Sequence, residues 1–162
     1  MKTRTLLSIG LSALTLTGTA VGVAFPGMIA IAASAENPQR AASEATRAQR
    51  FLAAGKPDKA IERAELAVGY APRTAEYRAL LGQSYLAAGR FASAQQAFRD
   101  ALTLDASNGA VALKLALTQI AQGDWAGARM TLDSNADRIP ASDRGLARAW
   151  RAVTSRQAIA MR

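Results

Sequence analysis

Apolar and polar residues are distributed in three different ways along the chain. Residues 5–35 carry no charge and begin with a stretch rich in leucine. Residues 41–140 combine alanine and leucine with scattered charges, and residues 141–162 place apolar residues at the spacing of one helix face. The pattern predicts an uncharged N-terminal segment, a long middle part and an amphipathic C-terminal helix.

The middle part is built on a repeated spacing. Glycine recurs at a fixed interval, at Gly55, Gly89 and Gly123. Five residues after each glycine stands an alanine, and seven residues before each stands a small residue (Ala48, Gly82 and Ala116). So many offsets in step indicate an internal repeat of three units, 41–74, 75–108 and 109–140, with a 34-residue period.

The middle unit resembles the tetratricopeptide repeat, in which two antiparallel helices occupy one period of this length. The residues that carry the resemblance are Leu81, Gly82, Tyr85, Gly89, Phe91, Ala94, Phe98 and Ala101. The unit departs from the motif at Arg78 and Ala106. The resemblance implies an all-α fold, a short right-handed superhelix of about three helix pairs plus a C-terminal capping helix. In it, Phe91 and Phe98 would fill the space between helices.

The repeat predicts six helices joined by short turns. They are expected near residues 41–54, 58–70, 74–88, 91–104, 109–122 and 125–136. Residues 36–40, which include Pro38, are expected to form a linker.

The C-terminal segment, residues 141–162, is predicted to be a basic helix that covers the open end of the third unit. Its apolar face is formed by Leu146, Trp150 and Val153. The opposite face carries a basic patch of Arg144, Arg148 and Arg151. Two alternatives stay open: the helix lies on an anionic membrane surface or binds an acidic partner, or residues 156–162 begin the second helix of a partial fourth repeat.

The N-terminal segment, residues 1–35, has the features of an export signal. Lys2 and Arg4 precede the uncharged stretch, which ends in Ala33-Ser34-Ala35, an A-x-A cleavage pattern. The stretch is also long enough for a retained membrane anchor. We therefore expect an exported protein, either free in the periplasm or anchored in the inner membrane and facing the periplasm.

Composition narrows the possible chemistry. The 162 residues include neither cysteine nor histidine, which excludes imidazole and thiol catalysis and thiolate metal sites. No catalytic, cofactor-binding or metal-binding residue and no cofactor is predicted, and a cell-wall hydrolase using serine or carboxylates stays a remote alternative. The net charge of +8 is scattered and interspersed with acids, so nucleic acid is not an expected partner.

Partners of the family usually lie on the concave face, which the first helix of each unit lines. The residues expected there are Gln49, Ala79, Gln83, Leu86, Leu113, Lys114, Leu117 and Ile120. Because this set is mostly apolar, it favours an apolar or amphipathic protein segment. The family's clamp for C-terminal carboxylates needs several Lys, Arg and Asn on these helices. Only Lys114 comes close, so that specificity is not expected.

The expected function is a non-enzymatic interaction scaffold of the bacterial cell envelope. A pilus or secretion assembly factor that uses the arginine-rich C-terminal helix is the alternative. A further possibility is that Leu117 and Ile120 pack on the C-terminal helix, which would partly fill the groove.

Overall fold

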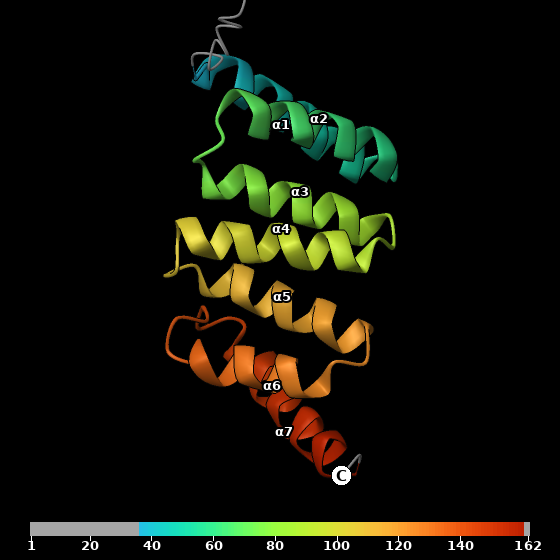
Figure 1. Cartoon of the computed structure of the whole chain (residues 1–162), viewed down its shortest axis with the longest axis vertical. Coiled ribbons are helices and arrows are strands. Elements are labelled where there is room, and N and C mark those ends of the chain that lie inside the picture. The colour runs from blue at the N-terminus through green and yellow to red at the C-terminus, as the bar shows by residue number, and fades with distance from the viewer. Residues whose placement is uncertain (1–35, 161–162) are drawn as a thin grey trace, which may run out of the picture. The chain divides into compact units, whose positions relative to one another are not determined.

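The computed structural model describes residues 36–160, and over this range it contains only α-helices and turns. The all-α prediction is therefore confirmed. The helices are α1 (Pro38–Ala53), α2 (Pro57–Tyr70), α3 (Ala75–Ala87), α4 (Phe91–Leu104), α5 (Gly109–Ala121), α6 (Trp125–Ser134) and α7 (Arg144–Ala160). Consecutive helices pack on one another, and α3 to α6 follow one below the other in Figure 1. None of the described helices is long and apolar enough to span a membrane.

Each helix pair turns at a glycine with a left-handed backbone. The φ angles of Gly55, Gly89 and Gly123 are 67°, 71° and 78°, a conformation in which a Cβ atom would cost energy. After Gly89, the amide of Arg90 donates to the carbonyl of Tyr85 at 2.9 Å, which closes the end of α3. The glycine period of the sequence is thus a period of helix ends.

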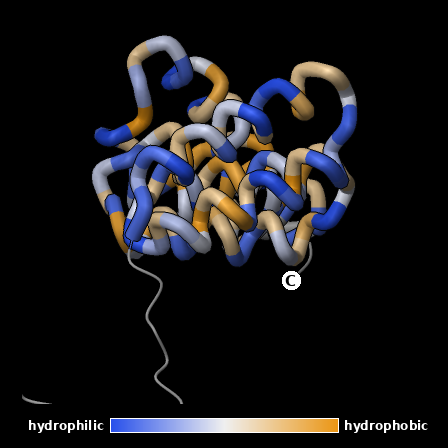
Figure 2. The backbone as a smooth tube through the Cα atoms, turned by 90° about the horizontal axis from the view of Figure 1, so that it is seen from above, coloured by the Kyte–Doolittle hydropathy of each residue, from blue (hydrophilic) through white to orange (hydrophobic). Residues whose placement is uncertain are grey.

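The core lies between the helices of each pair and between successive pairs. Phe98 of α4 is fully buried and contacts a cluster that includes Ala79 and Ala94. A Cβ added to Gly82 would lie 2.7 Å from the ring of Phe98, so glycine permits the close approach of α3 and α4. Figure 2 shows hydrophobic backbone positions gathered inside the stack.

Three local predictions need correction. Residues 38–40 belong to α1 and not to a linker, because Pro38 suits the first helical position and Asn37 caps it by accepting from the amide of Arg40. Phe91, the first residue of α4, remains 36% exposed and does not fill the space between the helices. Residues 156–160 continue α7 without a break, so they do not begin a second helix.

The face of α7 that packs on the stack also differs from the prediction. Ala147 and Thr154 are buried, Trp150 is half-buried, and Leu146 and Val153 are 49% and 40% exposed. Leu146 and Val153 therefore do not cover the third repeat.

The reason is a change of register between α6 and α7. In one core cluster, Val111 packs with Phe98 of the preceding helix pair. In the next cluster Leu132, one period after Phe98, packs with Ala147, which lies two positions beyond one period from Val111. The fully buried Thr118 and Thr154 show the same 36-residue spacing. The residues of α7 that pack on the stack thus lie two positions later than the period predicts, which corresponds to about 200° of rotation around a helix.

Candidate partner-binding surfaces

The predicted partner-binding residues lie on α1, α3 and α5, the first helices of the three pairs. We call the surface that they form the first-helix surface. Gln49 is exposed, and five others are half-buried: Gln83, Leu86, Lys114, Leu117 and Ile120. Ala79 and Leu113 are buried, at 6% and 5% exposure, because they belong to two core clusters. These two residues support the surface from below.

The C-terminal helix covers part of α5. Leu117, Ile120 and Trp150 pack against one cluster of buried residues, and this cluster contains Ala147 of α7. The apolar end of the first-helix surface is therefore continuous with α7.

The register of α7 adds residues that the sequence assigned elsewhere. With the 36-residue spacing, Val153 is the counterpart of Leu117, and Leu146 is the counterpart of Ala110. Both side chains are exposed. Both lie one turn from Trp150, which packs against the same core cluster as Leu117, so they extend the first-helix surface at its C-terminal end. Their i, i+7 spacing was visible in the sequence, but it indicated a buried face.

Lys114 is the cation of the first-helix surface. Burial lowers the pKa of its ammonium group, and the nearby carboxylate of Asp143 opposes this shift. In α3 the same position holds Leu80, which is buried. Lys114 is thus a charge at a place where the second repeat buries an apolar side chain.

The basic patch lies on a different side of α7. Arg151 pairs with Asp133 of α6, with 2.6 Å between Nε and Oδ1. Arg144 donates from Nε to the carbonyl of Ile139 at 3.3 Å. Arg148 donates to the carbonyl of Arg144, also at 3.3 Å, and no described carboxylate lies within 4 Å of its guanidinium. The patch therefore keeps more positive charge than its neighbours neutralise.

The buried polar groups serve the helices themselves. The hydroxyls of Ser84 and Thr118 donate to carbonyls one turn earlier in their own helices. Gln119 accepts from the hydroxyl of Thr131 at 2.8 Å. Between residues 36 and 160, every buried side-chain N or O atom has a partner, and no group of three acidic residues is placed to hold a metal ion.

Family models match most of the stack. Two models described as tetratricopeptide repeat match residues 45–110 and residues 85–155. Together they include α2 to α6 and reach into α7. Residues 45–155 therefore consist of tetratricopeptide repeats.

Solved structures share this repeat fold at low sequence identity. The chain is similar to the TPR2AB domain of yeast Sti1 in complex with an Hsp90 peptide (18% identity, TM-score 0.69); the match covers 74% of this chain and 48% of that one. It is also similar to the first TPR of Spaghetti (RPAP3) bound to the HSP90 peptide SRMEEVD, with 18% identity and a TM-score of 0.70. This match covers 76% of this chain and 96% of that one. A third similar chain comes from a T3SS complex of Aeromonas hydrophila, with 19% identity and a TM-score of 0.70. This match covers 75% of this chain and 84% of that one. No curated protein matches the chain.

Proposed function

We propose that this protein is an exported scaffold of the bacterial cell envelope that binds an apolar or amphipathic protein segment on its first-helix surface. The observation that carries the proposal is the cluster of apolar side chains at the C-terminal end of that surface. Leu117, Ile120 and Trp150 are half-buried against one core cluster, and Leu146 and Val153, one turn from Trp150 on α7, are exposed. Contiguous exposed apolar residues are typical of protein interaction sites.

The similar repeats of yeast Sti1 and Spaghetti bind peptides in their structures. This supports a peptide or helix as the partner. The polar residues of the surface, Gln49 and Gln83, would supply hydrogen bonds to the backbone of an extended segment. Lys114 is the one cation among the residues predicted to form this surface, so the apolar end carries the proposed specificity.

Photo-crosslinking in the producing bacterium tests this function. A photoreactive residue at Val153 or Leu117 should give a discrete crosslinked protein, and the same residue at the exposed Met130 of α6 should not. Leu117→Glu should abolish the Val153 adduct because a charge replaces an apolar contact. Equal adducts from all three positions would contradict the assignment of the surface.

Export is proposed from the N-terminal sequence, and residues 1–35 lie outside the described structure. The mass of the mature protein is the direct test. A chain that begins at Glu36 indicates cleavage after Ala35, and an intact N-terminus in the membrane fraction indicates an anchor.

A second candidate function is binding to an anionic membrane surface through the basic patch. The observation that favours it is that Arg144 and Arg148 are exposed and, within residues 36–160, pair only with backbone carbonyls. Binding of the protein to anionic vesicles should then fall steeply with salt and be lost in the Arg144→Ser, Arg148→Ser variant. Binding that both changes leave intact would reject this role.

A further inference from the structure

Two positions on the first helix of a pair contact the second helix of that pair. One is the small position, where Gly82 lies beneath the ring of Phe98. The other is four residues earlier, where Arg78 pairs with Asp100 of α4, with 3.2 Å between Nη1 and Oδ2.

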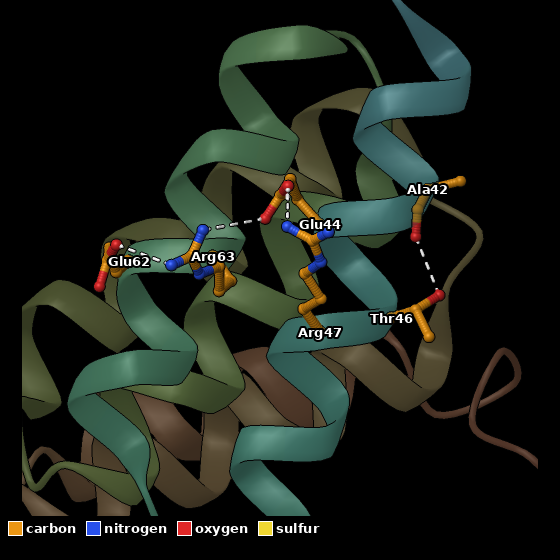
Figure 3. Close-up of polar contacts among 6 residues, drawn as sticks. All are labelled: Ala42, Glu44, Thr46, Arg47, Glu62 and Arg63. Carbon is orange, nitrogen blue, oxygen red and sulfur yellow. Dashed lines mark hydrogen bonds and ion pairs between the residues drawn. The ribbon is translucent and has the colours of Figure 1, made fainter.

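In the first pair, the residue at the charged position has the opposite sign. Glu44 stands one repeat period before Arg78, and its Oε2 accepts from Nη1 of Arg63 on α2 at 3.5 Å (Figure 3). The sign of the first-helix residue differs between the two pairs, and the second helix supplies the opposite charge each time. A charged residue at this position therefore indicates the charge of the helix that packs there.

In α7 both positions are open. With the 36-residue spacing, Ala112 and Ala116 of α5 correspond to Arg148 and Ala152 of α7. The two alanines of α5 are buried at 1% and 0% exposure, whereas Arg148 and Ala152 are both exposed. The described chain thus ends with a first helix that presents a charged position and a small position without a second helix over them.

A groove follows this side of α7. Two adjoining hollows share Arg148 and Arg151 as lining residues; one reaches Ile139 and the other reaches Ser155. From Arg144, which lines the first hollow, to Ser155 the helix axis extends about 16 Å, at a rise of 1.5 Å per residue. This length fits a helix of about three turns.

We propose that this groove, the α7 seat, binds an amphipathic helix of a partner protein that presents a carboxylate and a large apolar side chain, and that this helix completes a fourth helix pair. A large apolar side chain of the partner packs on Ala152, as Phe98 packs on Gly82. A carboxylate of the partner pairs with Arg148, as Asp100 pairs with Arg78. Asp133 pairs with Arg151 and lies 4.0 Å from Nε of Arg129, so Arg148 and Arg144 are the cations of the groove that no described carboxylate pairs.

The charges of the chain favour another protein as the occupant. A second copy that packed α7 on α7 would bring Arg148 and Arg151 against the same arginines, and like charges at close distance repel. Residues 1–35 contain no Asp or Glu and offer no carboxylate to Arg148. The seat is also separate from the proposed first-helix surface, so each proposal can fail alone.

A peptide with the sequence of α4, FASAQQAFRDALTL, is a suitable probe, because this helix already meets an arginine and a small residue in the structure. Fourteen residues form a marginal helix in water, so the peptide needs a side-chain staple on its outer face. Fluorescence anisotropy with the full-length protein should show saturable binding. Arg148→Glu should weaken it about tenfold or more, and a peptide with Lys in place of Asp100 should prefer this variant to the native protein.

Two further variants separate docking from folding. Ala152→Leu should abolish binding without lowering the melting temperature, because Ala152 is exposed in the free protein. Arg99→Glu makes the same charge change at an exposed position of α4 and should leave the affinity unchanged. Binding that neither Arg148→Glu nor Ala152→Leu weakens, or no binding at millimolar peptide, would overturn the proposal.

The chain has no cysteine, so a single introduced thiol reports the place of docking. A cysteine near the N-terminus of the peptide should form a disulfide with Ser155→Cys, because helices of a pair are antiparallel. Leu117→Cys on the first-helix surface is the control and should stay unlinked. Preferential linkage to Leu117→Cys would place the peptide on the other surface and contradict the seat.

Discussion

The α3–α4 pair and α7 show the same type of helix in two surroundings. In the pair, Gly82 and Arg78 lie beneath α4, which contributes Phe98 and Asp100. In α7, the corresponding Ala152 and Arg148 are exposed. Only the packed face of α7, with Ala147 and Thr154, is buried to the same degree as in the repeats. The comparison separates the residues that stabilise the stack from those that no described second helix covers.

Removal of the aromatic ring from the complete pair should have the largest effect. Phe98→Ala leaves a cavity among Ala79, Ala94 and Val111 and should lower the free energy of unfolding by about 3–5 kcal/mol. Leu146→Ala, which removes an exposed apolar side chain from α7, should change it by less than about 0.5 kcal/mol. Urea unfolding followed by circular dichroism measures both, and equal losses would remove the distinction between the two regions.

The small positions should respond in the same unequal way. Gly82→Val places methyl groups against the ring of Phe98 and should cost about 1–3 kcal/mol, although valine is a better helix former than glycine. Ala152→Val meets no second helix and should cost less than about 0.5 kcal/mol. Thermal melts of the two variants are sufficient. A large loss for Ala152→Val would indicate that α7 is covered on this side.

The charged positions should show a smaller difference. A double-mutant cycle on Arg78 and Asp100 should give a coupling of about 0.2–1 kcal/mol, because both side chains are about one-third exposed. Arg148→Ala should leave stability unchanged within about 0.5 kcal/mol. A stability loss for Arg148→Ala as large as that for Arg78→Ala would show that Arg148 has a partner within the chain.

The smallest effect concerns Lys114, which stands where α3 has the buried Leu80. Burial lowers its pKa below the usual 10.5, so the unfolded chain binds the proton more tightly. Burying the charged ammonium group of Lys114 therefore costs folding free energy, and this cost is complete at pH values below the pKa in the folded protein. The cost disappears as pH rises from that pKa towards 10.5, so the free energy of unfolding should rise with pH in this window. Lys114→Leu should add up to about 1 kcal/mol at neutral pH and abolish this rise. A variant that keeps the pH dependence would assign it to another group.

The sequence was sufficient to predict the repeated part of the fold. The 34-residue glycine period marks helix ends because three successive pairs turn through the same left-handed conformation. The small residue Gly82 marks the close approach of α3 and α4 because a Cβ there would overlap the ring of Phe98, and Ala116 at the same position of α5 is fully buried. Both predictions rest on local geometry that recurs at a fixed spacing.

The orientation of α7 could not be predicted in the same way. Leu146 and Val153 are the most apolar residues at helical spacing, and hydrophobic periodicity alone assigns them to the buried face. The structure buries Ala147 and Thr154 instead, because the irregular turn between Ser134 and Arg144 shifts the packed residues of α7 two positions beyond the period. The length of an irregular turn cannot be read from the repeat spacing. The 34-residue spacing also connects Leu113 with Ala147, so the burial of Ala147 alone does not reveal the shift. The candidate surfaces on α7 therefore depend on the structure.

Thiol accessibility of single cysteines on α7 tests the central claim most directly. The native chain has no cysteine, and Ala152 and Thr154 are two residues apart on the same helix. The 36-residue register predicts that Ala152→Cys reacts with a maleimide at nearly the rate of an unstructured peptide and that Thr154→Cys is strongly protected. If the 34-residue period continued into α7, Ala152 would correspond to the buried Thr118. Protection of Ala152→Cys together with rapid reaction of Thr154→Cys would then contradict the register and the open seat that follows from it.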